Sequence, residues 1–287
     1  MGSRRSKVYL DTNVFDSYFR SNPDAYIRCR SAKKRGILFV GSVEVVQELA
    51  NNREDLAEAK RSYRRFLEIV SPHLLSQPRA ELIKRELSTL APLAHEFAFF
   101  PPQFARERLD DIWKDFESDD LDKACRTFCA ESKEYFKNGR EEWREIAKRV
   151  PIDPALSFDQ FWLRFVQMET FADVVKEVAD QAGSPVPDMA ECRARLDSIR
   201  TFKTAMVVTA AQIYANLNPE CKIKPHKNDK MDAGHAIVAS QADIFVTADG
   251  PFLKVLKLAE GALPYKPISA DEFITSLGDG DAVSYPG

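Results

Sequence analysis

Four carboxylates that lie far apart in the chain stand just past the ends of expected strands or in the first turns of expected helices. They are Asp11, Glu48, Asp232 and Asp249. Carboxylate oxygens are the ligands that hard divalent cations prefer. Four such groups brought together would repel one another unless a positive charge lay between them. The chemistry to expect is therefore that of a metal site, provided that the fold gathers these residues.

The elements that would position them alternate between strand and helix. Short apolar runs predict strands over residues 7–10, 37–40, 244–247 and 266–268. Each is followed by a segment with helical spacing and a polar residue suited to capping, namely Asn13, Ser42, Asp249 and Ser269. Asp229 is a similar cap for the helix that carries Asp232. This alternation is typical of an α/β fold with a parallel sheet sandwiched by helices. Ligands of such sheets bind outside the carboxyl ends of the strands, where the four acids are predicted to lie.

Each acid also has a simpler interpretation when taken alone. Asp11 is compatible with a turn, and Asp249 with the cap of a helix that begins near Pro251. Asp232 suits the positive end of a helix dipole. Glu48 follows Glu44 by one helical turn, which is common on a solvated face but costs stability unless a cation lies nearby. The prediction of a metal site therefore rests on the expected convergence of all four acids at one edge of the sheet.

Four short motifs, in order along the chain, resemble those of the PIN-domain nuclease family. The motifs are Asp11-Thr12-Asn13 after the first strand, Ser42 with Glu48, Asp232-Ala233 with His235, and Val246-Thr247 with Asp249 and then Phe252. The resemblance covers about residues 5 to 90 and 220 to 277. The sequence departs from the family pattern at Gly250-Pro251 and in a long middle segment.

The resemblance implies a metal-dependent endoribonuclease. Asp11, Asp232 and Asp249 would hold one or two Mg²⁺ or Mn²⁺ ions, and Glu48 would act as a ligand or through bound water. A surrounding set of residues would orient these acids by hydrogen bonds, namely Thr12, Asn13, Thr247 and His235. For His235, a buried, hydrogen-bonded state is favoured over that of a metal ligand. Asp229 and Asp16 are additional acidic candidates, each with a helix-capping or surface alternative.

A nuclease must also hold the phosphates of its substrate, a task that usually falls to lysine and arginine. The basic run before Asp232 is the one expected to contact RNA, through Lys222, Lys224, Lys227 and Lys230. Two earlier basic runs, over residues 28–35 and 60–65, fit solvated helix faces equally well.

The chain is expected to consist of a discontinuous core, residues 5–91 and 217–280, with a helical insertion over residues 92–216. The insertion lacks evident strands and contains all three tryptophans and many phenylalanines. Aromatic residues at helical spacing are more typical of a packed core than of a cofactor site. They include Phe97, Phe99, Phe100, Phe104, Phe158, Phe161, Trp162 and Phe165.

Composition narrows the cellular context. The net charge of −3 gives no overall polycationic character, and the five cysteines have no CxxC spacing that would indicate a zinc site or a disulfide framework. No apolar run is long enough for a membrane helix, and no secretion signal is evident at residues 1–7. A soluble protein of the reducing cytoplasm is expected.

Two functions follow as hypotheses. The first is an RNA-cleaving enzyme, either the toxin of a toxin–antitoxin pair or an RNA-processing or defence nuclease, with an antitoxin or other protein partner and a homodimer as options. The second is a catalytically silent relative that binds RNA or protein. The first is favoured because all four acidic positions are filled. No Gly-x-Ser-x-Gly motif supports a serine hydrolase. A dehalogenase-type phosphatase would need a second aspartate where Asn13 stands.

Overall fold

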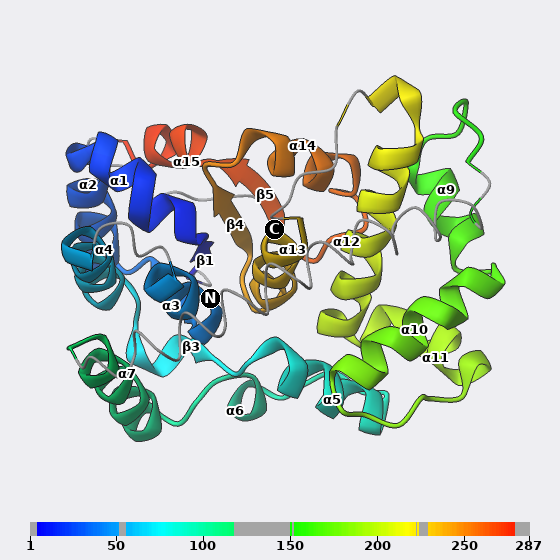
Figure 1. The fold of residues 1–287 in the computed structure, drawn as a ribbon, viewed down its shortest axis with the longest axis horizontal. Helices are drawn as coiled ribbons and strands as arrows, with labels where there is room; N and C mark the ends of the chain where they lie inside the picture. The colour runs from blue at the N-terminus through cyan, green and yellow to red at the C-terminus, as the bar shows by residue number, and fades with distance from the viewer. Residues whose placement is uncertain are drawn as a thin grey trace.

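The computed structural model describes residues 5–51, 56–117, 150, 152–221, 223 and 229–278. Its centre is a five-stranded sheet in which all neighbouring strands are parallel, in the order β3-β2-β1-β4-β5. Figure 1 shows β1, β4 and β5 in the middle of the molecule, with helices on either side. The expected class, an α/β fold with a parallel sheet, is confirmed.

Four of the five strands fall where the sequence predicts them, within two residues at each end. The strands are β1 (Lys7–Leu10), β2 (Leu38–Ser42), β3 (Leu75–Ser76), β4 (Ile244–Thr247) and β5 (Lys266–Ser269). The fifth, β3, was not expected. It has two residues and follows directly on a 3₁₀ turn, so it carries no periodic apolar signal of its own.

Helices fill the connections between the strands. The segment from β1 to β3 contains a π-helical turn η1 (Val14–Tyr18), α1 (Phe19–Ser21), α2 (Pro23–Lys34), α3 (Val43–Asn51), α4 (Leu56–Ile69) and η2 (Pro72–Leu74). After β4 come α14 (Gly250–Leu258) and, beyond β5, α15 (Ala270–Ser276).

The long connection from β3 to β4 is helical throughout its described parts. It contains α5 (Arg79–Thr89), α6 (His95–Ala98), α7 (Pro102–Glu117), α9 (Phe158–Phe165), α10 (Glu169–Gln181), α11 (Met189–Arg195), η3 (Leu196–Ser198), α12 (Arg200–Leu217), η4 (Pro219–Cys221), α13 (Asp229–Val238) and η5 (Ala239–Gln241). Among the described helices, none is long and apolar enough to cross a lipid bilayer.

The two faces of the sheet pack against different helices, as the alternation of side chains along a strand requires. On one face, the ring of Tyr9 stacks on that of Phe245 and lies beside His235 of α13. On the other, Phe39 packs edge-on against Phe273 of α15. Gly41 faces the same way: a Cβ there would come within 2.8 Å of the Phe66 ring on α4, so only glycine fits.

The chain order of the strands creates a switch point between β1 and β4. From β1 the chain moves outward to β2 and β3, and it then returns to the opposite side of β1 as β4 and β5. The connections on the two sides therefore diverge above the carboxyl ends of β1 and β4, which is where parallel sheets of this kind bind ligands.

Part of the expected insertion packs directly on the core. α12 lies against α13, α14 and α5 (Figure 1). Glu86 of α5 fixes the start of α12, because its buried carboxylate accepts hydrogen bonds from the backbone N–H groups of Thr201 (3.0 Å) and Phe202 (2.7 Å). The expected domain boundaries at residues 92 and 216 stay a prediction.

The aromatic residues of the insertion divide into two groups. Phe158, Phe161, Phe165 and Phe171 are buried and pack ring against ring, as a core interpretation predicts. In contrast, Phe97 is 49% exposed and Phe104 is 62% exposed, so the prediction that these two belong to a core was wrong. Both lie near turns on the surface of the molecule, in α6 and α7.

Candidate metal centre

Asp11 lies at the switch point, as the first residue after β1. Its backbone N–H donates to the carbonyl of Val246 (2.9 Å), which holds it beside the end of β4, and only 1% of its surface is exposed. Its carboxylate accepts three hydrogen bonds, from the Thr12 backbone N–H (2.8 Å), the Asn13 side-chain amide (2.7 Å) and the Thr247 hydroxyl (2.9 Å). These donors fix its orientation.

Asn13 serves the site rather than the helix that it was expected to cap. It makes no side-chain cap hydrogen bond to η1. Besides Asp11, its amide also donates to the Thr247 hydroxyl (3.1 Å), and its carbonyl oxygen accepts from the backbone N–H of Ala248 (2.8 Å). Asn13 therefore ties the ends of β1 and β4 together around the Asp11 carboxylate.

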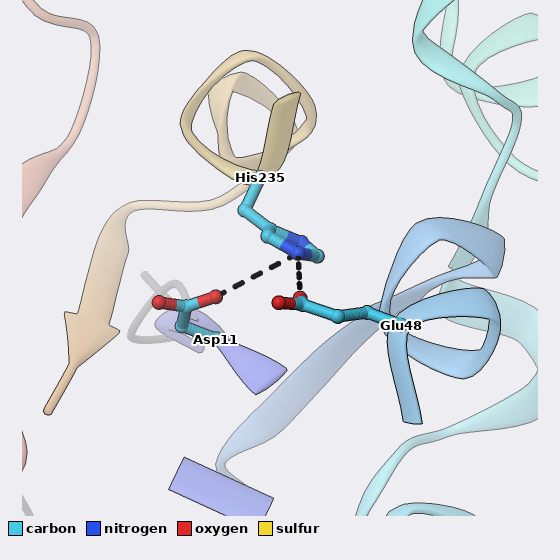
Figure 2. Close-up of side chains that lie close together, drawn as sticks. All are labelled: Asp11, Glu48 and His235. Atoms are coloured by element: carbon cyan, nitrogen blue, oxygen red, sulfur yellow. Dashed lines mark hydrogen bonds and ion pairs between the residues drawn. The ribbon is translucent and has the colours of Figure 1, made fainter. Parts of the chain in front are cut away.

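Glu48 reaches the same place from α3. Ser42 positions this helix, because its hydroxyl accepts from the backbone N–H of Val45 (3.3 Å) at the first turn. Figure 2 shows the Glu48 carboxylate pointing toward the His235 ring, at 2.7 Å between Oε2 and Nε2. The Asp11 Oδ1 atom lies 3.8 Å from the same nitrogen. One ligand atom from each of these three residues lies within 4.8 Å of the others.

Asp232 lies within the electrostatic field of the other three acids. It is 7% exposed, and its pKa is raised to about 9 by burial and by the negative charges of Asp11, Asp249 and Glu48. Asp232 is therefore protonated at neutral pH when no cation is bound. This sensitivity to three carboxylates from three other parts of the chain is evidence that the four acids are gathered in one place.

Asp249 caps a helix and also lies beside the residues that hold Asp11. Its Oδ1 accepts from the backbone N–H of Phe252 (2.7 Å) and so caps α14, as expected. Its own backbone N–H donates to the Thr247 hydroxyl (3.0 Å), which also contacts Asp11. The capping role and a role at the site are compatible, because each carboxylate oxygen has more than one acceptor position.

His235 is the cation of this cluster. Burial alone would lower its pKa, but the charge of Asp11 and the hydrogen bond and charge of Glu48 raise it to about 9. In the protonated ring both nitrogens donate, Nδ1 to the Tyr9 hydroxyl (2.9 Å) and Nε2 to Glu48. Tyr9 in turn contacts the Ser42 hydroxyl (2.8 Å). The imidazolium thus offsets part of the negative charge of the acids.

Burial and neighbouring hydrogen-bond donors act in opposite directions on the pKa values of Asp11 and Glu48. Burial raises the pKa of Asp11, and His235 with the Thr247 and Thr12 hydrogen bonds offsets this only in part. Burial would also raise the pKa of Glu48, but the hydrogen bonds from His235 and Thr12 hold it below its ordinary value. Glu48 is therefore an ionised acceptor in the absence of metal.

Three further residues adjoin the cluster and were not expected from the sequence. Tyr9 contacts His235, and the charge of Glu44 acts on both Tyr9 and His235. Glu44 also accepts from the backbone N–H of Arg79 (2.9 Å) at the start of α5. The exposed Arg79 side chain lies against Gly234, where a Cβ would overlap its guanidinium. This places a cation next to the turn of α13 that carries Asp232 and His235.

Several expected residues cannot be placed with the cluster. Lys222, Lys224 and Lys227 lie outside the described residues, and so do the side chains of Lys230 and Asp229. Asp16 is half-buried within η1. Of the two earlier basic runs, Lys33 donates to the carbonyls of Glu68 and Val70, and Arg65 pairs with Glu58 (2.9 Å), so these two cations have internal partners.

The donor set fits a hard divalent cation better than a soft one. Four carboxylates with one imidazole offer oxygen ligands and no thiolate, which suits Mg²⁺ or Mn²⁺. The high proton affinity of Asp232 is a second sign of fit, because a group of acids that retains a proton at neutral pH has excess negative charge that a cation would neutralise.

Comparisons with protein families, with curated proteins and with solved structures find no match to this chain.

Proposed function

We propose that this protein is a metal-dependent endoribonuclease with a PIN-like fold. The observation that carries the proposal is the position of the acids. Asp11, Glu48, Asp232 and Asp249 come from four separate segments, and the charges of the other three raise the pKa of Asp232, while Asp11 lies at the switch point of the sheet. A purely structural role does not account for them, because a buried cluster of acids costs stability.

In this proposal Asp11, Asp232 and Asp249 hold one or two Mg²⁺ or Mn²⁺ ions, and Glu48 is a fourth ligand or acts through water. When bound, the metal would supply a water of lowered pKa for attack on phosphorus and would offset charge on the leaving oxygen. Asp232 would give up its proton in order to hold the cation. Thr12, Asn13 and Thr247 hold Asp11 in one orientation, and His235 does the same for Glu48.

Arg79 is proposed to contact a phosphate of the substrate. Arg79 is exposed, and its guanidinium packs against Gly234, on the turn of α13 that carries the acid Asp232. A residue with a side chain at position 234 would occupy the space that the guanidinium fills. Planar guanidinium groups bind phosphate oxygens in pairs. Contact between the substrate phosphates and the lysines before Asp232 stays a prediction; these are Lys222, Lys224, Lys227 and Lys230.

The test is incubation of a mixed RNA pool with the protein in Mg²⁺ or Mn²⁺, compared with EDTA and with Asp11→Asn. We expect internal cleavage only with the wild-type protein and metal. Asp173→Asn, an exposed position on α10, is the matched control and should cleave as the wild type does. Intact RNA in every reaction would reject the enzyme and favour the silent binding module.

The biological setting proposed with this activity is the cytoplasm. The enzyme would act there as an RNA-processing or defence nuclease, or as a toxin held by a protein inhibitor. Purification of the protein with its natural partners would separate these: a small inhibitor that blocks cleavage indicates the toxin, and a cleavage pattern confined to particular transcripts indicates processing. Size-exclusion chromatography would test the homodimer.

A further inference from the structure

Two open pockets lie along α5, and α3, the helix that carries Glu48, lines one of them. The one beside α3, with a volume of about 470 Å³, is lined by residues that include Glu44, Gln47, Gln77, Glu81, Arg85 and Arg108, and we name it the proximal pocket. The second, of about 460 Å³, is lined by residues that include Lys84, Arg85, Thr89, Pro92, Leu93 and Phe97, and we name it the distal pocket. Glu81 and Arg85 line both pockets, so the two pockets are neighbours, and we call them together the groove.

Two residues of the proximal pocket are neighbours of Glu48 on α3. Gln47 precedes Glu48 directly, and Glu44 lies one helical turn before it on α3. The charge of Glu44 acts on His235, so the pocket wall and the cluster share an electrostatic environment. A chain bound at the acids can therefore continue into this pocket along α3.

The distal pocket contains an aromatic ring and a guanidinium suited to stacking. The Arg85 guanidinium lies 5.5 Å from the centroid of the Phe97 ring, and Arg85 Nε donates a 2.6 Å hydrogen bond to the Glu81 carboxylate. The ring itself is 49% exposed. Pro92 and Leu93 add apolar walls. Exposed aromatic rings and guanidinium planes are the surfaces on which proteins stack unpaired nucleobases.

The cations around the groove outnumber the acids that lack a partner. Glu81 pairs with Arg85, and Glu44, the other acid of the lining, accepts from the backbone N–H of Arg79. Lys84 and Arg108 are exposed at the edges of the distal and proximal pockets. An apolar groove made for a peptide would not require cations at both ends, whereas a nucleotide strand needs them for its phosphates.

We propose that the distal pocket binds an unpaired base of the RNA substrate, stacked on Phe97 and Arg85, while the backbone crosses the proximal pocket to the acids. This inference rests on the proposed function and names its substrate class: RNA that is single-stranded beside the cleavage site. Bases inside a duplex are stacked on each other and do not reach the pocket.

The experiment is fluorescence anisotropy with a short, fluorescein-labelled, single-stranded RNA of mixed sequence and the full-length protein in EDTA, where no cleavage occurs. We expect Phe97→Ala to bind about tenfold more weakly, the effect of losing one stacked base. The control is Phe104→Ala, which removes a ring of similar exposure outside both pockets and should bind as the wild type does. The same RNA annealed to its complement should bind no better to the wild type than to Phe97→Ala.

A second readout separates this inference from the proposed function. With Mn²⁺, the small diester bis(p-nitrophenyl) phosphate should be hydrolysed equally by the wild type and by Phe97→Ala, because it does not reach the distal pocket. Equal RNA affinity of the wild type and Phe97→Ala would overturn the base pocket, as would an equal loss in Phe97→Ala and Phe104→Ala. Absence of hydrolysis by the wild type would overturn the metal-dependent enzyme instead, and the binding result would still stand.

Discussion

Replacement of Asp232 by asparagine should stabilise the metal-free protein while it abolishes cleavage. In the fold, Asp232 is buried beside Asp11, Asp249 and Glu48, and its pKa is raised from 3.8 to about 9. In the unfolded chain the carboxylate loses its proton at the ordinary pKa. Asparagine has nearly the same shape, carries no charge and needs no proton, so it removes the cost of keeping this site neutral.

The size of the effect follows from linkage between proton binding and folding. Because the pKa of Asp232 is higher in the folded protein than in the unfolded chain, its contribution to the free energy of unfolding is fully present below pH 3.8. This contribution is lost as the pH rises from 3.8 toward about 9. At pH 7 the loss for Asp232 is roughly 4 kcal/mol, since each tenfold change in proton affinity corresponds to about 1.4 kcal/mol. Asp232→Asn should recover up to about this amount in the free energy of unfolding.

Urea unfolding followed by circular dichroism, in EDTA at pH 5, 7 and 9, measures this difference. The gain from Asp232→Asn should increase from pH 5 to pH 9. Asp173→Asn on the exposed face of α10 is the matched control, and its free energy of unfolding should stay within about 0.5 kcal/mol of the wild type. Addition of Mn²⁺ should then stabilise the wild type, by about 2.7 kcal/mol at a hundredfold excess over Kd, but not Asp232→Asn.

One result would refute the reasoning. If Asp232→Asn unfolds at lower urea than the wild type in EDTA at pH 7, the Asp232 carboxyl makes a stabilising interaction. Repulsion among the four acids would then not destabilise the metal-free protein, and the argument that they bind a cation would lose its support.

Three other perturbations test separate parts of the structure. The apparent affinity for Mn²⁺, measured by calorimetry, should increase about tenfold per pH unit between pH 6 and 8, because Asp232 must release one proton; a flat profile would contradict this. Arg79→Ala should raise KM for RNA about tenfold with little change in kcat, as expected for a lost phosphate contact, whereas exposed Arg164→Ala should leave both unchanged. Glu86→Ala should lower the free energy of unfolding by about 2 to 4 kcal/mol, because two buried N–H groups of α12 lose their acceptor. Glu86→Gln keeps one acceptor oxygen and should lower the free energy of unfolding less. Equal losses in the two variants would contradict the role of Glu86 as the acceptor at the start of α12.

The sheet could be predicted from sequence where strands are buried. The runs at β1, β2 and β4 are mostly apolar and bounded by turn residues, so composition identifies them. The edge strand β5, Lys266–Ser269, has a weaker apolar signal and is marked by the capping residue Ser269 at its end. β3 could not be found this way, because its two residues are held by pairing with Gly41 and Ser42 and by a bridge to Phe99. Such a strand exists through long-range contacts and leaves no local pattern.

The same distinction applies to the candidate site. The acids could be proposed from sequence because Asp11 and Asp249 stand just past buried strands and Glu48 and Asp232 stand in short motifs near helix starts. Tyr9, by contrast, has the aromatic, strand-favouring character of any core residue. Its hydroxyl is informative only when His235 and Ser42 are brought to it in space. Arg79 was missed for the same reason. It follows Pro78 at an ordinary helix start, and its nearness to Gly234 depends on how α5 crosses α13.

The packing of α12 explains why the middle of the chain matters to a site whose acids lie outside it. α13 carries Asp232 and His235 and is short, so its own hydrogen bonds hold it weakly. Its neighbour α12 is long and buried along most of its length, and Glu86 fixes where α12 begins. On the other side, α13 contacts α3, which carries Glu48. The position of His235 relative to Glu48 thus depends on how α12 and α3 hold α13. The segment between β3 and β4 is therefore part of what builds the carboxylate cluster, in addition to any role in binding substrate.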